Sequence, residues 1–218
     1  MRFRDRADAG RALVEHVAAV GLTSPVVLGL PRGGVPVAAE LAGALGAPLD
    51  VLVARKVGAP GHAEFGIGAV AEGGVRVADP AVLARLGISD DDFARLAARE
   101  EANVTRLVDR YRSGRTLPDL TGTEVVVVDD GLATGMTALA ALQALRGMSP
   151  SRLVLAVPVG ARDSVERLSE VADVVVCPVQ PPRFEAVGVW YQDFGATSDD
   201  EVLRHLHDRT ARAHDAQP

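Results

Sequence analysis

The chain has 218 residues, 48% of them hydrophobic and 24% charged, a composition that excludes wholesale disorder. Its net charge of −6 excludes bulk attraction to nucleic acid, and no apolar run approaches the ~20 residues that a membrane span needs. A single cysteine, Cys177, excludes an internal disulfide and, with no apolar signal segment in view, predicts a cytoplasmic protein.

The N-terminal part of the chain predicts a parallel unit of strand, helix and strand. Apolar residues at helical spacing predict a helix over 5–20, which ends at Gly21. Short apolar runs predict strands at 26–28 and 49–54, with a helix over 35–45 between them. We expect parallel neighbours, because a crossover helix joins strands that run in the same direction.

The middle of the chain predicts a flexible segment, a hairpin and then helices. Glycine and proline are frequent in residues 55–68, which favours a mobile loop. Short strands are expected at 67–71 and 75–77, with two glycines between them. A helical insertion is predicted over about 79–114, because a proline opens it and apolar residues then recur at helical spacing.

The second half of the chain alternates strands and helices. Three apolar runs predict strands, at 124–128, 153–157 and 174–177. Helices are expected between them, one ending at Arg146 and one over about 161–170. This alternation predicts an α/β fold with an open, mostly parallel sheet flanked by helices. We expect one domain over residues 1–210 and a frayed tail at 211–218.

The strongest functional pattern spans residues 125–137, where four valines lead into Asp129-Asp130 and a loop rich in glycine and threonine precedes a helix. Unpaired N–H groups at a helix N-terminus, together with such a loop, suit an anion. Two carboxylates would repel a phosphate, so they suit sugar hydroxyls or a magnesium ion instead. The pattern predicts a sugar phosphate at the carboxyl edge of a parallel sheet.

A plainer interpretation of the same residues is an acidic strand end followed by a threonine helix cap. The sequence contains neither the Gly-Lys-Ser/Thr of a Walker loop nor a Gly-x-Gly-x-x-Gly that opens a helix. It also lacks the Gly-x-Ser-x-Gly elbow of serine hydrolases, and its five histidines show no metal-ligand spacing. These absences disfavour the other common nucleotide-binding and hydrolase motifs.

The thirteen residues 125–137 resemble the phosphoribosyl pyrophosphate (PRPP) signature of type I phosphoribosyltransferases. The resemblance implies a core sheet with a small hood region, and catalytic roles for Asp129 and Asp130, which would hold the ribose 2- and 3-hydroxyls. It implies a Mg²⁺ ion that bridges the pyrophosphate and the ribose hydroxyls, with the same two acids as candidate contacts. The 5-phosphate would be held by the loop of Gly131, Leu132, Ala133, Thr134, Gly135, Met136 and Thr137.

A second candidate site, Arg32-Gly33-Gly34, follows the first predicted strand. The fork-shaped donors of an arginine suit phosphate oxygens, and glycines let the backbone approach an anion closely. This segment resembles the pyrophosphate-binding loop of the same family. The alternative is an ordinary strand-to-helix turn with a surface arginine.

Arg55 and Lys56 begin a third candidate site, and Lys56 is the only lysine in the chain. The segment resembles the mobile loop that closes over PRPP in many members of the family. The resemblance implies that the two cations are catalytic, because they would neutralise charge that grows on the departing pyrophosphate. The alternative is a solvated loop, in which His62 and Glu64 are exposed groups rather than proton carriers.

The C-terminal segment 181–194 gathers aromatic residues in a chain in which they make up only 4%. Aromatic rings stack on planar bases, and a hood near the end of the sheet supplies the acceptor pocket in the resembling family. The candidate pocket residues are Phe184, Val187, Trp190 and Tyr191. The alternative is that these rings pack on the core or form a dimer contact.

The resemblance implies transfer of a 5-phosphoribosyl group from PRPP to a nitrogen of a nucleobase or related heterocycle, with release of pyrophosphate. It also implies a homodimer. Ala133 stands where hypoxanthine and guanine members carry an acid, which disfavours that subgroup. Two alternatives stay open: a PRPP- or nucleotide-sensing regulator without turnover, and a hydrolase or phosphorylase that uses the same cradle.

Overall fold

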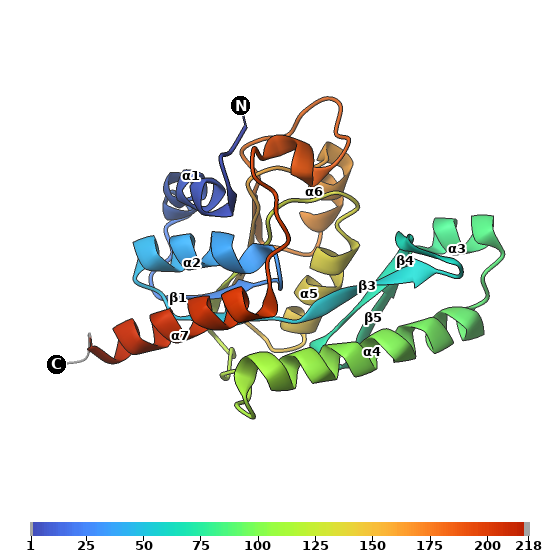
Figure 1. Ribbon diagram of the computed structural model, residues 1–218, viewed down its shortest axis with the longest axis horizontal. Coiled ribbons are helices and arrows are strands. Elements are labelled where there is room, and N and C mark those ends of the chain that lie inside the picture. The colour runs from blue at the N-terminus through green and yellow to red at the C-terminus, as the bar shows by residue number, and fades with distance from the viewer. Residues whose placement is uncertain (1, 216–218) are drawn as a thin grey trace.

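The centre of the computed structural model is a five-stranded sheet in which every neighbouring pair is parallel (Figure 1). The structure describes residues 2–215, without the side chains at 63–64 and 209–215. The strand order is β2-β1-β6-β7-β8. The strands are β1 (Pro25–Gly29), β2 (Leu49–Val51), β6 (Glu124–Val128), β7 (Arg152–Ala156) and β8 (Val174–Val176). The α/β fold with an open parallel sheet is therefore confirmed.

Both faces of this sheet are covered by helices, which explains why its central strands are apolar throughout. Val126 and Val128 face a layer formed by α1 (Arg6–Ala18), α2 (Gly34–Leu45) and α7 (Asp199–Asp215). Val125 and Val127 face the opposite layer, which contains α5 (Met136–Arg146) and α6 (Arg162–Leu168). All four valines are fully buried, so neither face of β6 meets solvent.

Residues 54–112 form a second layered unit, which we call the hood from here on; the aromatic segment 181–194, expected to form the acceptor pocket, is not part of it. Its antiparallel sheet has the order β3-β4-β5. The hood consists of β3 (Ala54–Ala59), β4 (His62–Ala71), the 3-10 turn η1 (Glu72–Gly74), β5 (Val75–Ala78), α3 (Pro80–Leu86) and α4 (Asp90–Arg112). Alternate residues of the hood sheet pack against α4 on one face and α5 on the other, so α5 contacts both sheets. In Figure 1 the hood extends to one side of the core.

The prediction of a mobile loop over 55–68 is wrong, because this segment forms the hairpin of β3 and β4. Ala59 pairs with His62, so the proline and a left-handed glycine, Gly61 (φ +73°), sit in the tight turn between the strands. Val57 and Ala59 are buried on the face opposite to exposed side chains, as a half-buried strand requires. The glycine and proline content marked one turn rather than a long loop.

Two further predicted boundaries differ from the bounds of the strands and helices in the structure. The strand expected over 49–54 stops at Val51, because the chain leaves the parallel sheet there and enters the hood at Ala54. Helix α7 continues to Asp215, where the sequence predicted a frayed tail from 211. Neither glycine nor proline occurs between Asp199 and Pro218, so no helix-breaking residue ends the helix earlier. The remaining tail residues, 216–218, lie outside the described part of the chain.

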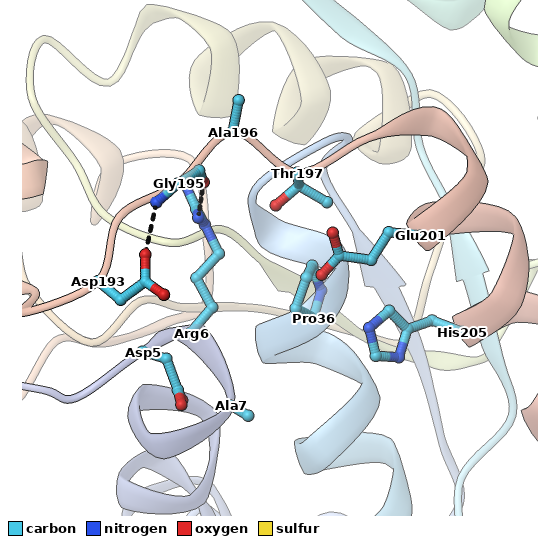
Figure 2. A pocket seen from close by; sticks show the side chains of 10 residues that line it. All are labelled: Asp5, Arg6, Ala7, Pro36, Asp193, Gly195, Ala196, Thr197, Glu201 and His205. Atoms are coloured by element: carbon cyan, nitrogen blue, oxygen red, sulfur yellow. Dashed lines mark hydrogen bonds between the residues drawn. The ribbon is translucent and has the colours of Figure 1, made fainter.

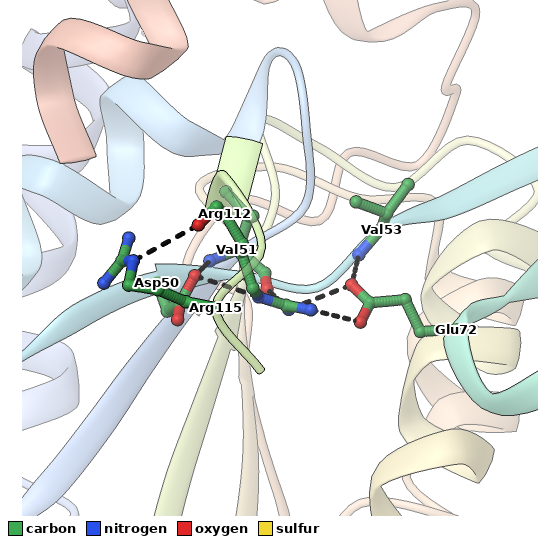
Figure 3. Close-up of polar contacts among 6 residues, drawn as sticks. All are labelled: Asp50, Val51, Val53, Glu72, Arg112 and Arg115. Atoms are coloured by element: carbon green, nitrogen blue, oxygen red, sulfur yellow. Dashed lines mark hydrogen bonds and ion pairs between the residues drawn. The ribbon is translucent and has the colours of Figure 1, made fainter. Parts of the chain in front are cut away.

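A buried arginine joins the base of the hood to the core (Figure 3). The side chain of Arg112, at the end of α4, is 2% exposed. Its guanidinium donates to both carboxylate oxygens of Glu72 (2.6 and 3.0 Å) and to the carbonyl oxygen of Val51, and Asp50 Oδ1 lies 3.4 Å from its Nε. Glu72 also accepts from Val53 N (2.6 Å). The network therefore fixes the point where β2 passes into the hood.

Across the described residues, no helix is both long enough and apolar enough to cross a membrane.

Candidate functional site

The two motifs predicted to bind PRPP meet at the carboxyl edge of the central sheet. Gly29 of β1 pairs with Val128 of β6, so the chain leaves both strands at the same level. A Cβ atom at Gly33 would lie 2.1 Å from Asp130 Oδ2, and one at Gly34 would lie 2.5 Å from Val128 O. A side chain at Gly34 would collide with the backbone of β6, and one at Gly33 would displace the Asp130 carboxylate. The glycines therefore bring the Arg32 loop directly against the acid pair.

The acid pair carries more negative charge than its surroundings neutralise. Burial raises the pKa of Asp129 well above its ordinary value of 3.8, and the charge of Asp130 raises it further. Burial also raises the pKa of Asp130, although a hydrogen bond from Arg6 opposes that shift. Asp129 Oδ1 accepts from Asp130 N (2.8 Å), which holds one carboxylate in place. Such an arrangement favours hydroxyl donors or a cation as ligands.

Arg6, which the sequence did not single out, is the counter-ion of the pair. Its Nε donates to Asp130 Oδ2 (2.8 Å), and its Nη1 donates to Gly195 O (2.7 Å). Figure 2 shows the side chain reaching from α1 to Gly195 along a pocket of about 390 Å³. The ring of Phe194 stacks on the guanidinium, with its centroid 4.0 Å from the central carbon. Arg6 thereby links the start of α1 and the segment at Phe194 and Gly195 to Asp130.

The sequence shows no local signal for Arg6, because its partner lies 124 positions away. The pairing arises from the N-terminal segment, which runs beside the aromatic segment. Phe3 N donates to Trp190 O and Gln192 N donates to Phe3 O, both at 2.8 Å. This long-range contact, together with the packing of α1 on α2, brings the first turn of α1 to the acid pair.

The four predicted acceptor residues differ in how far the structure buries them. Tyr191 is 4% exposed, its ring packs against Phe3 and Phe194, and its hydroxyl donates to Asp130 O (2.6 Å). Burial raises its pKa, so the phenol stays protonated and keeps donating. In this structure Tyr191 supports the acid pair rather than presenting a free stacking face. Three partly buried side chains surround the same small cluster: Phe184, Val187 and Trp190.

The loop predicted to hold the 5-phosphate leads into α5. Gly135 adopts a left-handed backbone conformation (φ +68°) directly before Met136, the first residue of the helix. Leu132 N donates to Val159 O (2.9 Å), which anchors the start of the loop to the strand end beyond β7. A Cβ atom at Gly131 would lie 2.6 Å from Val187 Cγ1, so the loop also touches the candidate acceptor residues.

The structure places one of the three predicted cations in the core and the other two in the hood. Arg32 follows a cis peptide bond with Pro31; it is half exposed, and its Nη1 lies 4.0 Å from Asp199 Oδ1 of α7. Arg55 and Lys56 lie on β3 of the hood, where Arg55 Nε donates to Glu100 Oε2 (2.7 Å). The acids thus belong to the core and two of the cations to the hood. The side chain of Glu64 lies outside the described residues.

The residues at the site fit a magnesium ion that arrives with a diphosphate. Within the described residues no three His, Cys, Asp or Glu side chains form a group that could hold a metal ion. Mg²⁺ commonly takes one or two carboxylates and completes its shell with phosphate oxygens and water. Asp129 and Asp130 would supply that carboxylate share, and the excess negative charge at the pair favours a cation.

The raised pKa of Asp129 leads to a stability prediction. The unfolded carboxyl loses its proton near 3.8, whereas the folded one keeps it to higher pH, so the folded chain loses stability as pH rises through this interval. Asp129→Asn replaces the titrating carboxyl by an amide, so the variant does not lose stability in this way as pH rises. We expect the variant to exceed the native chain in free energy of unfolding by about 1 kcal/mol near neutral pH. Urea unfolding from about pH 4.5 to pH 7.5 should show the difference growing with pH.

Asp173 provides a control of opposite sign. A hydrogen bond from Arg146 (2.6 Å) lowers the pKa of Asp173, so this carboxylate stabilises the fold increasingly as pH rises through its ordinary value. Asp173→Asn should therefore be less stable than the native chain by a nearly constant amount from about pH 4.5 to pH 7.5, and the difference should shrink only as pH falls below about 3.8. A pH-independent destabilisation by Asp129→Asn would contradict the electrostatic account of the pair.

Known proteins are similar to this chain in sequence and in fold. Residues 5–193 match the family model described as "Phosphoribosyl transferase domain". The Mycobacterium tuberculosis protein named "Putative phosphoribosyl transferase Rv0571c" is 47% identical over 210 residues, which cover 96% of this chain and 47% of that protein. The chain thus spans about half the length of the curated relatives it matches.

Solved structures agree with this match. The crystal structure of TT1426 from Thermus thermophilus shares 47% sequence identity, covers 95% of this chain and 99% of its own, and superposes with a TM-score of 0.80. The structure of AQ2163 from Aquifex aeolicus, at 14% identity and a TM-score of 0.53, shares the fold over 92% of this chain and 86% of its own.

Proposed function

Because the chain belongs to the phosphoribosyl transferase family, we propose that it transfers the 5-phosphoribosyl group of PRPP to a nitrogen of a nucleobase or related heterocycle. One observation carries the proposal: the acid pair Asp129-Asp130 lies directly against Gly33-Gly34, next to Arg32. PRPP carries a pyrophosphate on one side of its ribose and a phosphate on the other. A site for it needs two anion-binding loops with acceptors for the ribose hydroxyls between them. At this edge of the sheet the acid pair lies between the loop at Arg32 and the loop 131–137.

Each part of PRPP then has a partner. The loop 131–137 holds the 5-phosphate through main-chain N–H groups at the start of α5. Asp129 and Asp130 accept hydrogen bonds from the ribose 2- and 3-hydroxyls. Arg32 and the two glycines after it receive the pyrophosphate, because an arginine fork and a bare backbone both suit phosphate oxygens.

In the reaction the bond from C1 of the ribose to the pyrophosphate oxygen breaks, and a bond from C1 to the acceptor nitrogen forms on the opposite face. Negative charge grows on the pyrophosphate and positive charge on the ribose ring. Arg32 stabilises the leaving group, and Asp129 and Asp130 lie beside the ribose. Bound Mg²⁺ would supply further charge neutralisation at the pyrophosphate. The chain accelerates the reaction by positioning and by charge stabilisation.

The hood cations are proposed to act when the hood closes on the bound substrate. Arg55 and Lys56 lie on a strand rather than on a loose loop, so the hood would bring them in as part of a folded unit. Phe184, Val187 and Trp190 are the proposed acceptor surface, since Val187 already touches Gly131 of the phosphate loop. Tyr191 is buried in the cluster against which these three side chains pack, and so supports the surface. A homodimer and a cytoplasmic location remain predictions.

Pyrophosphate release from PRPP with Mg²⁺, measured across a panel of purines, pyrimidines and amine acceptors, tests the proposal. We expect release that depends on one class of heterocycle and is slow without it. Release that needs no acceptor would contradict transfer and favour hydrolysis. PRPP binding without release on any acceptor would favour a sensor, and the absence of PRPP binding would contradict the assignment altogether.

A further inference from the structure

Three successive carbonyl groups of the phosphate loop are held from one side by the segment that contains α6. The donors are spaced three residues apart, so they lie along one edge of that segment. The bonds run from Ala161 N to Leu132 O (2.9 Å), from Ser164 Oγ to Ala133 O (2.6 Å), and from Arg167 Nη2 to Thr134 O. The sequence reasoning missed this edge, although the spacing of 161, 164 and 167 is the pattern that a helical edge would show.

The carbonyl contacts determine where the loop N–H groups point. In a planar trans peptide the C=O and N–H of one unit point in opposite directions. The N–H groups that follow the three held carbonyls, those of Ala133, Thr134 and Gly135, are therefore directed away from α6. Within the described part of the chain these three N–H groups have no hydrogen-bond acceptor. Three unpaired donors thus face one side of the loop, where an anion would satisfy them.

Two side chains on α6 provide two of the three contacts. Ser164 is buried, and its hydroxyl reaches only as far as the loop carbonyl. The guanidinium of Arg167 lies beside Gly135, where a Cβ atom would be 3.5 Å from Nη2, and its buried Nε has no hydrogen-bond partner. Arg167 therefore combines a hydrogen bond to the loop with a positive charge directly behind it.

We propose that Ser164 and Arg167 are positioning residues for a phosphate dianion, the 5-phosphate end of the substrate. By holding two loop carbonyls on the α6 side, they turn the N–H groups of Thr134 and Gly135 into the cradle before the substrate arrives. The inference rests on the proposed function, because it assigns these residues to the 5-phosphate half of the same site. They contact the loop and not the reacting atoms, so they act on binding of one end of PRPP.

Calorimetry with two probes tests this role. Ribose 5-phosphate reports on the loop 131–137, and pyrophosphate with Mg²⁺ reports on the loop at Arg32. We expect Arg167→Met to weaken ribose 5-phosphate binding about tenfold and Ser164→Ala about fivefold, with pyrophosphate binding changed less than about twofold. Ser164→Thr keeps a hydroxyl and should restore most of the affinity. Arg162→Met removes an exposed arginine from the same helix and should leave both probes unchanged.

The outcomes separate this inference from the proposed function. If the native chain binds ribose 5-phosphate and Arg167→Met binds it equally well, the positioning role is wrong and the proposed function stands. If the variant loses both probes equally, its effect is general damage to the fold, which also contradicts the role. If the native chain does not bind ribose 5-phosphate at all, the proposed function is contradicted, and the inference that rests on it is contradicted as well.

Discussion

The double variant Asp129→Asn/Asp130→Asn is expected to release pyrophosphate from PRPP about a thousandfold more slowly than the native chain. The amides keep the size of the carboxylates and can still accept hydrogen bonds, but they carry no charge toward the ribose or toward Mg²⁺. Because burial raises the pKa values of both acids, and the charge of Asp130 raises that of Asp129 further, the native charges oppose folding. The variant should therefore remain folded, and its loss should be one of function.

Initial rates of pyrophosphate release at saturating acceptor measure this effect, with circular dichroism as the check on folding. Asp90 and Asp91 form another adjacent acid pair, exposed at the start of α4, so Asp90→Asn/Asp91→Asn is a matched control. The control should keep the native rate. A double variant at 129 and 130 that retained more than about a tenth of the native rate would contradict the role of the acid pair.

Arg112→Met is expected to lower the free energy of unfolding by about 3–5 kcal/mol, because it leaves a buried carboxylate without its partner. The side chains of Arg112 and Glu72 are 2% and 10% exposed, and two hydrogen bonds join them. The same arginine caps the carbonyl of Val51, where β2 ends. Its removal would leave polar groups without a hydrogen-bond partner at the junction between hood and core (Figure 3).

Chemical denaturation measures the loss, and two further variants identify its cause. Glu72→Gln/Arg112→Met removes the unpaired charge but keeps an acceptor for Val53 N, so it should recover part of the stability. Arg110→Met, two residues away on α4, removes a half-exposed ion pair with Asp199 and should cost no more than about 1 kcal/mol. A loss for Arg112→Met as small as that for Arg110→Met would contradict the account of the junction.

The sequence predicted those features that depend on neighbours along the chain. The valine run of β6, the adjacent acids and the glycine-rich loop appear together in residues 125–137 because a strand, a tight turn and a helix start impose local requirements. Gly33 and Gly34 were also found locally, but their close contact with the acids depends on the register of β1 against β6.

The features that the sequence did not reveal depend on distant pairs. Arg6 meets Asp130 only because the N-terminal segment packs beside residues 190–195, and Arg112 meets Glu72 only because α4 folds back along the hood. An arginine in the first or last turn of a helix has no distinctive spacing. The hairpin of β3 and β4 was mistaken for a loop because the glycines and the proline at its turn dominate the composition of the segment, and the strand pairing on either side is not visible in the sequence.

A crystal structure of the chain with PRPP and Mg²⁺ would test the central claim most directly. The account predicts the 5-phosphate within the loop 131–137, the ribose hydroxyls on Asp129 and Asp130, and the pyrophosphate beside Arg32. A ligand bound elsewhere, or a phosphate that avoids the N–H groups of Thr134 and Gly135, would contradict it.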